Sequence, residues 1–231
     1  MIISADDMRT NLATIESSIA AACARANRTD RPKLLVATKY VTAKDMGVLQ
    51  AAGIRLVGEN RAEELETKWR MWDDSFEFHF IGHLQSRKAR QVLPCVTLIH
   101  SVDSIGLVEE LEKRAEQPVK VLLEVNVSGE NTKYGILPAH AEAFLSEAWG
   151  FRKVRFVGFM TMAPFSEDPE ITRPVFRSLR LLRDRLASLF TGRYQLSELS
   201  MGMSNDYEVA VEEGATIVRV GNALFSNAQG G

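Results

Sequence analysis

Apolar and polar positions follow two alternating patterns along this chain. From residue 33 almost to the end, short apolar runs with β-branched and aromatic residues alternate with longer amphipathic runs. The short runs predict eight strands, at Lys33–Thr38, Arg55–Val57, Phe76–Ile81, Thr97–His100, Val119–Val127, Val154–Met160, Gln195–Leu199 and Thr216–Val220. The longer runs predict helices at Ala43–Ala52, Arg61–Met71, Gln85–Leu93, Ser104–Glu116, Pro138–Trp149, Ile171–Phe190 and Asn205–Glu213, after an opening helix at Ala5–Ala26.

Residues at the ends of these segments support the assignment. Gly53 and Gly214 stand where a helix must end before a strand, a position that favours a residue without a Cβ. Ser204 is a candidate N-cap for the last long helix, with Asp206 and Glu208 in its first turn.

Eight βα units follow one another with no change of composition and no linker rich in Pro, Ser or Gly. This order predicts an α/β fold, a single (β/α)8 TIM barrel with an extra N-terminal helix, and one domain over residues 1–231. A doubly wound open sheet repeats the same unit and is the alternative, but eight strands in a chain of this length favour closure.

Composition narrows the class of protein. With 45% hydrophobic and 25% charged residues, the chain has the proportions of a soluble globular protein. Its formal charge of −2 and its scattered basic residues argue against nucleic-acid binding, and the basic cluster at Arg177–Arg185 has the spacing of a solvated helix face. No apolar run is long enough to span a membrane, and the N-terminus resembles no targeting peptide, so we expect a cytoplasmic protein without a membrane contact. Two cysteines outside any metal-binding pattern fit a reducing compartment and predict no metal site.

In a barrel of this kind, functional residues lie at the C-terminal ends of the strands. Lys39 follows the first predicted strand, and an apolar setting there would disfavour the ammonium form and leave an amine able to attack an aldehyde. A surface lysine with its stem along the barrel rim is the alternative interpretation.

Small residues mark the ends of the last two predicted strands. The loop SMGMS contains Ser200, Gly202 and Ser204, and the loop VGNA contains Gly221 and Asn222. Such loops let backbone N–H groups approach a phosphate, which barrels often bind after strands seven and eight.

Arg219 is unusual because a strand buried on both faces should be almost entirely apolar. Its guanidinium needs a partner, either Glu59 or Glu124 in an ion pair or the ring nitrogen of a ligand. His79 alternates with two phenylalanines and is expected to be a hydrogen-bonded core residue.

Seven segments together resemble one family, the pyridoxal phosphate homeostasis proteins of the YggS/PROSC type. These segments are VATKY with Lys39, VGEN at 57–60, FHFIGHLQSRK at 78–88, VLLEVNVSGENTKYGI at 121–136, GFMTMAP at 158–164, LSMGMSND at 199–206 and VRVGNALF at 218–225. Their order and spacing extend over about residues 30–226.

The resemblance implies a barrel similar to the N-terminal domain of alanine racemase, with pyridoxal 5′-phosphate (PLP), the vitamin B6 cofactor, held as a Schiff base on Lys39. It also implies that Arg219 donates a hydrogen bond to the pyridine nitrogen and that Asn60 lies beside the ring. The residues that it places around the phosphate are Ser200, Gly202, Ser204, Gly221 and Asn222.

A guanidinium at the pyridine nitrogen disfavours protonation of the ring, which then stabilises negative charge poorly. We therefore expect a non-catalytic carrier that takes part in intracellular PLP homeostasis, and that buffers PLP or supplies it to the apo-forms of PLP-dependent enzymes. The absence of a second racemase-like domain favours a monomer. The alternative is an amino-acid racemase or another PLP-dependent enzyme on the same barrel, for which only His79, His83 or Tyr134 offers an acid or base.

The chain departs from the family pattern at three positions. His83 stands where the family usually has Pro, Arg87 where it has Asn, and Asn222 where it has Thr. The loss of a hydroxyl at residue 222 predicts weaker or reoriented phosphate binding.

Overall fold

The computed structural model describes residues 3–130 and 132–226, and in these residues eight parallel strands close into a barrel. Each strand pairs with the next in sequence, and β8 pairs with β1 to complete the ring. The strands are β1 (Lys33–Ala37), β2 (Leu56–Glu59), β3 (Glu77–Phe80), β4 (Leu98–Val102), β5 (Val119–Glu124), β6 (Val154–Met160), β7 (Glu198–Ser200) and β8 (Ile217–Val220). The closed barrel confirms the predicted fold and excludes the open sheet.

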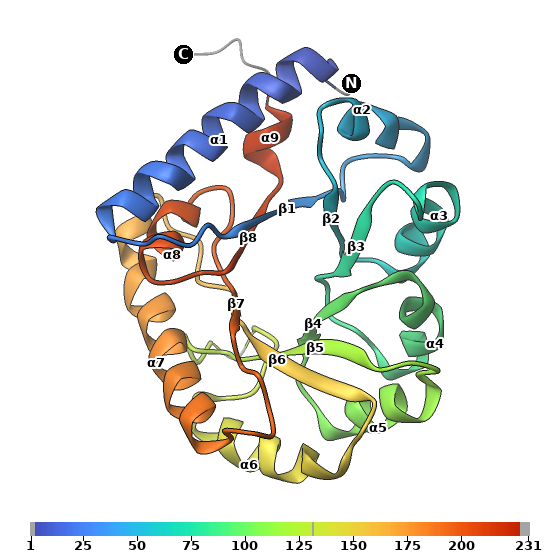
Figure 1. Ribbon diagram of the computed structural model, residues 1–231, viewed down its shortest axis with the longest axis vertical. Helices are drawn as coiled ribbons and strands as arrows, with labels where there is room; N and C mark the ends of the chain where they lie inside the picture. The colour runs from blue at the N-terminus through green and yellow to red at the C-terminus, as the bar shows by residue number, and fades with distance from the viewer. Residues whose placement is uncertain (1–2, 131, 227–231) are drawn as a thin grey trace.

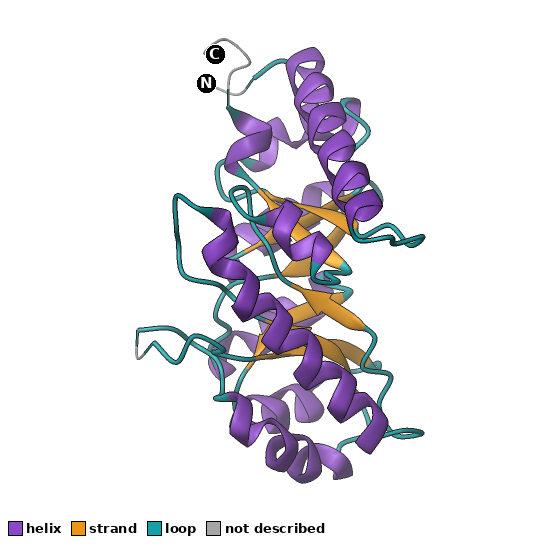
Figure 2. Ribbon diagram, turned by 90° about the vertical axis from the view of Figure 1, so that its left-hand side faces the viewer, coloured by secondary structure: helices purple, strands orange, loops and turns teal. Residues whose placement is uncertain are grey.

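Helices surround the strands on the outside (Figures 1 and 2). The α-helices are α1 (Ala5–Arg25), α2 (Met46–Ala51), α3 (Ala62–Trp72), α4 (Ala89–Val92), α5 (Ile105–Arg114), α6 (Ala141–Glu147), α7 (Arg173–Leu189), α8 (Tyr207–Glu212) and α9 (Asn222–Phe225). Short 3₁₀ turns, at Ala43–Asp45, Ser86–Lys88, Leu93–Cys95, Pro138–His140, Ala148–Gly150 and Pro169–Thr172, precede or follow several of them. The predicted N-terminal helix is confirmed as α1, which packs against α8 and α9 on one side of the barrel (Figure 1).

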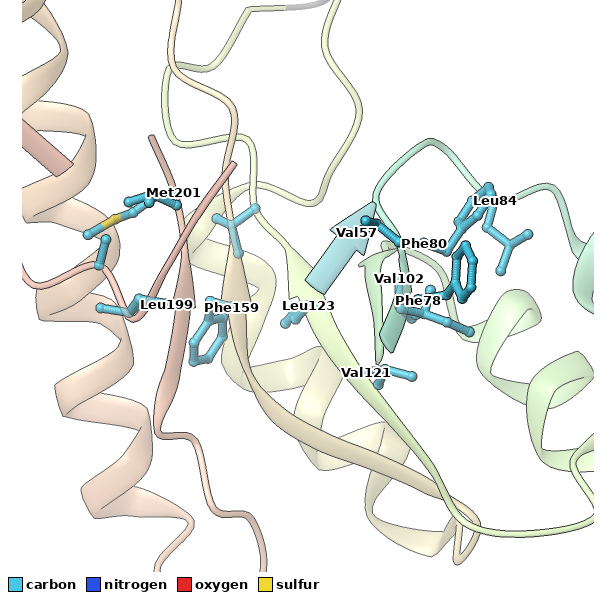
Figure 3. Close-up of a cluster of buried hydrophobic side chains, with 14 of the residues drawn as sticks. Val57, Phe78, Phe80, Leu84, Val102, Val121, Leu123, Phe159, Leu199 and Met201 are labelled. Carbon is cyan, nitrogen blue, oxygen red and sulfur yellow. The ribbon is translucent and has the colours of Figure 1, made fainter. Parts of the chain in front are cut away.

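Two apolar clusters stabilise the barrel. The larger one lies between strands and helices, and Figure 3 shows part of it, from Leu199 and Phe159 on one side to Phe78 and Phe80 on the other. The smaller one contains one residue from each of five strands, namely Leu35, Leu98, Leu122, Met160 and Ile217. Along their strands, these residues stand next to residues of the larger cluster. Because successive side chains of a strand face opposite ways, this smaller cluster fills the barrel interior.

Several predicted boundaries are wrong for local reasons. The predicted strand Gln195–Leu199 is observed only at Glu198–Ser200, and the predicted strand to Val127 ends at Glu124. Beyond Glu124 the chain turns, because Asn126 accepts hydrogen bonds from Ser128 and from the Gly129 backbone. The predicted helix Gln85–Leu93 is interrupted, with only one α-helical turn, α4, between two 3₁₀ turns, the second of which contains Pro94.

In the part of the chain that the structure describes, no helix combines the length and the apolar character that crossing a membrane requires. Cys23 and Cys95 are buried and not linked to each other.

Candidate functional site

A cavity of about 310 Å³ opens at the C-terminal ends of the strands. Six of the eight predicted site residues line it, and they come from the ends of β1, β2, β7 and β8: Lys39, Asn60, Ser204, Arg219, Gly221 and Asn222. Ala37, Gly58 and Ile81 line it as well, and the exposed Phe165 and Met162 stand in its wall on the loop after β6. The remaining two predicted residues, Ser200 and Gly202, lie deeper.

Lys39 follows β1 by two residues, and its side chain is exposed rather than surrounded by apolar groups. Its ammonium nitrogen lies 4.7 Å from the centroid of the Tyr40 ring. The expectation that burial would desolvate Lys39 is therefore wrong, because the chain leaves the barrel before this residue. The position at the rim of the cavity agrees with the prediction.

A buried ion pair that sequence reasoning missed supports the backbone beside Lys39. Lys68 of α3 pairs with Glu59 of β2, with 1% and 0% of the two side chains exposed. Lys68 Nζ also donates to the carbonyl oxygen of Thr38 at 2.9 Å, and the Thr38 hydroxyl donates to the same carboxylate. A signal was present in the sequence, since Lys68 continues the three-residue spacing of the buried Ala62 and Leu65.

Arg219 is buried in β8 and faces the base of the cavity. Its Nη1 donates to Ser200 Oγ at 2.6 Å and its Nη2 donates to the carbonyl oxygen of Thr161 at 2.9 Å. Burial lowers the pKa of Arg219 to about 10, against the opposing influence of Asp206 and Glu124. A guanidinium carries five N–H groups, so three have no hydrogen-bond partner among the described residues.

The ion pairs that the sequence suggested for Arg219 do not form. Glu59 is bound to Lys68, and no salt bridge joins Arg219 to Glu124. The Glu124 carboxyl is buried, with Oε2 lacking a partner among the described residues. Burial, together with nearby Asp103, raises the pKa of Glu124 to about 7.

The side of the cavity at β8 presents backbone donors. Ser204 Oγ accepts the N–H groups of Gly221 at 3.2 Å and Ala223 at 3.3 Å, at the start of α9. The prediction that Ser204 is the N-cap of α8 is therefore wrong. The N-cap of α8 is Asp206, whose carboxylate accepts a hydrogen bond from the Met203 N–H at 2.6 Å. Donors that converge on one oxygen atom can also bind an anion.

Ser200 and Gly202 act below the surface of the cavity. Ser200 is fully buried, and its hydroxyl contacts Arg219 and the Nδ1 atom of His100 at 2.8 Å. Gly202 has a φ of +89°, and a Cβ there would overlap the Ala210 side chain, so only glycine lets this turn pack against α8. Neither residue lines the cavity, but both are hydrogen-bonded to Arg219, which does.

The candidate acids and bases of the racemase alternative lie outside the lining of the cavity. The rings of His83 and Tyr134 stack on each other with centroids 3.9 Å apart, and neither lines the cavity. His79 is buried and hydrogen-bonded inside the barrel, as expected. The titratable side chains that do line the cavity are Lys39, Asp206 and Arg219.

No cluster of three or more His, Cys, Asp or Glu side chains within residues 3–130 and 132–226 could hold a metal ion. The site thus offers an amine, a buried guanidinium and backbone N–H donors, a combination suited to an anionic organic molecule with a carbonyl group.

Comparison with known proteins gives consistent results. The family described as alanine racemase, N-terminal domain, matches residues 6–229. A protein of Aquifex aeolicus named pyridoxal phosphate homeostasis protein is 42% identical over 219 residues, which cover 93% of this chain and 95% of that protein. The structure of PipY from Synechococcus elongatus, solved with PLP bound, has a TM-score of 0.82 and 32% identity, covering 95% of this chain and all of that one. An alanine racemase of Clostridium difficile shares the fold, with a TM-score of 0.73, 13% identity and coverage of 97% of this chain and 60% of that one.

Proposed function

The chain belongs to the pyridoxal phosphate homeostasis proteins, a family built on the alanine racemase N-terminal domain, and from that premise we propose that it binds PLP in the cavity at the C-terminal end of the barrel. One observation carries the proposal: Lys39, Arg219 and the backbone around Ser204 and Gly221 face a single cavity. These groups match the aldehyde, the ring nitrogen and the phosphate of PLP. The PLP in the PipY structure supports the same ligand.

We assign each part of the site to a part of the cofactor. Lys39 Nζ would hold the aldehyde carbon as a Schiff base, and the exposed Asn60 would lie beside the ring. The N–H groups of Gly221 and Ala223, with the Ser204 hydroxyl between them, would bind phosphate oxygens. Asn222 lines the same side of the cavity, is exposed, and would lie beside the phosphate.

Arg219 argues for a carrier rather than an enzyme. When bound, PLP supplies an aldehyde for amines and a ring that stabilises carbanions well only if its nitrogen is protonated. Arg219 lines the cavity and stays cationic at neutral pH, since its pKa of about 10 is still well above 7. A cationic donor at the ring nitrogen disfavours protonation there, so this site would hold the cofactor without promoting turnover.

We therefore propose a PLP carrier in cellular homeostasis of the cofactor, which buffers the reactive aldehyde and supplies it to the apo-forms of PLP-dependent enzymes. We propose further that residues 1–231 work as one cytoplasmic barrel domain and as a monomer. The fit of one complete cavity to one ligand supports the monomer, because every group in the assignment comes from the same chain.

Borohydride reduction in the presence of PLP, followed by mass mapping, tests the assignment directly. We expect a single pyridoxyl adduct on Lys39 that is lost in Lys39→Ala. Lys44→Ala is the matched control, because Lys44 is exposed five residues further along and lies outside the cavity. Label spread over surface lysines, or absent in the wild type, would contradict the proposal.

Exchange of the α-proton of alanine distinguishes a carrier from a racemase. We expect the PLP-loaded protein incubated with L-alanine in D₂O to leave the α-proton in place, because His79, His83 and Tyr134 all lie outside the cavity lining. Deuterium at the α-carbon, lost in Lys39→Ala, would instead favour an enzyme.

A further inference from the structure

Four polar side chains cross the barrel interior from Arg219 toward the N-terminal ends of the strands. Ser200 Oγ lies 2.8 Å from His100 Nδ1, and His100 Nε2 lies 2.9 Å from His79 Nδ1. His79 Nε2 in turn lies 3.2 Å from a carboxylate oxygen of Glu77, the first residue of β3. Ser200, His100 and His79 are buried, with 0%, 0% and 2% exposed, whereas the Glu77 side chain is 55% exposed.

The two ends of this chain fix the direction of its hydrogen bonds. Arg219 has donors only, so Ser200 Oγ must accept from it, and the serine proton needs an acceptor of its own. Among the described residues, the acceptor in reach is His100 Nδ1. At the other end an ionised Glu77 can only accept, so His79 Nε2 must donate.

Both ends are satisfied by one arrangement of the imidazoles. In this arrangement His100 and His79 would each be neutral with the proton on Nε2, and every donor would point from Arg219 toward Glu77. The opposite tautomers would direct the lone pair of His79 Nε2 at the carboxylate and leave the buried serine proton without an acceptor. Burial lowers the pKa of His100 well below its ordinary value, which agrees with a neutral ring.

This arrangement explains how a buried guanidinium without a salt bridge is tolerated. Hydrogen bonds in a chain polarise one another, so the carboxylate of Glu77 at one end makes Ser200 Oγ at the other end a stronger acceptor for Arg219. We propose that Ser200, His100 and His79 form a positioning chain that relays the polarisation of the Glu77 carboxylate to Arg219 and fixes its guanidinium for the ring nitrogen of PLP. The role toward PLP rests on the function proposed above, but the expected tautomers of His79 and His100 can be measured in the protein without ligand.

Nitrogen-15 NMR of protein labelled at histidine tests the chain without PLP. We expect His79 and His100, assigned by His79→Gln and His100→Gln, to show the neutral form with the proton on Nε2. A proton on His100 Nδ1, or a doubly protonated His100, would overturn the proposal.

Glu77→Gln tests the effect on the ligand from outside the cavity. Glu77 is partly exposed at the opposite end of the strands, so the substitution touches neither PLP nor the cavity wall. Glutamine keeps an acceptor for His79 but removes the charge and adds a donor, which makes both tautomers accessible. We expect PLP to bind about threefold to tenfold more weakly by fluorescence titration, with a shifted absorption band of the bound cofactor.

Glu116→Gln is the matched control, because Glu116 is exposed just before β5 at the same end of the barrel and is not part of the positioning chain. We expect its affinity and absorption band to equal those of the wild type. Equal behaviour of Glu77→Gln and Glu116→Gln, in a protein that binds PLP, would overturn the positioning chain alone. A wild type that took up no PLP on Lys39 would overturn the proposed function, and this inference with it.

Discussion

Lys68 Nζ lies 2.9 Å from the carbonyl oxygen of Thr38, the residue immediately before Lys39. The same ammonium group pairs with Glu59, whose carboxylate also accepts a hydrogen bond from the Thr38 hydroxyl. A buried pair of charges inside the barrel wall thus supports the point where the chain leaves β1 and presents Lys39 to the cavity. The buried Lys68 thus fixes the backbone of the residue that precedes the exposed Lys39.

Lys68→Met should therefore destabilise the protein strongly. Removal of one member of a buried pair leaves the Glu59 charge uncompensated, for which we expect a loss of about 3–5 kcal/mol in the free energy of unfolding by urea. Arg70→Met is the control, since Arg70 is exposed on the same helix and pairs only with Glu66, so its cost should stay within about 1 kcal/mol. Equal stability of the two variants would mean that the buried pair supports nothing.

The order of elements could be predicted from the sequence because hydrophobic periodicity reports which faces are buried. Eight strands and the opening helix are where the pattern placed them, within a few residues. The errors fall where local contacts outweigh periodicity, as at Pro94, at the turn held by Asn126, and at Ser204, which binds the backbone of α9 instead of capping α8.

The site could be predicted in part for a similar reason. A barrel brings strand ends together, so residues at those ends converge without knowledge of any contact, and six of eight line one cavity. The partners of buried charges were not predictable in this way. Whether Arg219 meets Glu59 or Ser200 depends on the stagger of strands around the barrel, which a single sequence does not specify.

Glu213 should give the protein part of its resistance to acid. Its carboxylate is 5% exposed and accepts from Arg173 at 3.3 Å, Arg177 at 2.8 Å and Arg180 at 3.2 Å. Burial opposes ionisation, but the hydrogen bonds from these arginines outweigh it and hold the pKa of Glu213 below its ordinary value. The predicted solvated face of α7 is thus partly a structural cluster.

Because the folded pKa of Glu213 is lowered, its contribution to stability is present above the unfolded pKa and is lost as the pH falls through the folded value. Glu213→Gln should cost about 1–3 kcal/mol of unfolding free energy at pH 7 and less at pH 3. Urea titrations at both pH values measure this, with the exposed Glu147→Gln as control. A cost independent of pH would show that packing, not charge, matters there.

Glu124 should affect the pH dependence of stability in the direction opposite to Glu213. Burial and Asp103 raise the pKa of its carboxyl to about 7 from an ordinary 4.5, so the folded state keeps a proton that the unfolded state has lost. Stability should therefore fall as the pH rises from about 4.5 to about 7, and stay lower above that range.

Glu124→Gln is neutral at every pH and should lack this loss. We expect the variant to gain about 1–3 kcal/mol in unfolding free energy over the wild type between pH 5 and pH 8. Asp103→Asn, which removes the neighbouring charge but leaves the buried carboxyl, should reproduce only part of the gain. If the wild type and Glu124→Gln showed parallel pH profiles, Glu124 would titrate as an ordinary carboxyl.

Asn222 offers a test that separates the phosphate from the rest of the ligand. It lies at the first residue of α9, exposed at the wall of the cavity, beside the Gly221 and Ala223 N–H groups that converge on Ser204. Asn222→Thr places a hydroxyl donor where the phosphate should bind, and a hydrogen bond to a charged acceptor contributes about 1–2 kcal/mol. We expect PLP to bind roughly tenfold more tightly to the variant, whereas pyridoxal, which lacks the phosphate, binds with unchanged affinity. Fluorescence titrations with both compounds measure the two constants on one protein. A gain shared equally by PLP and pyridoxal would place the phosphate away from α9, because only a contact with the phosphate itself can distinguish the two ligands.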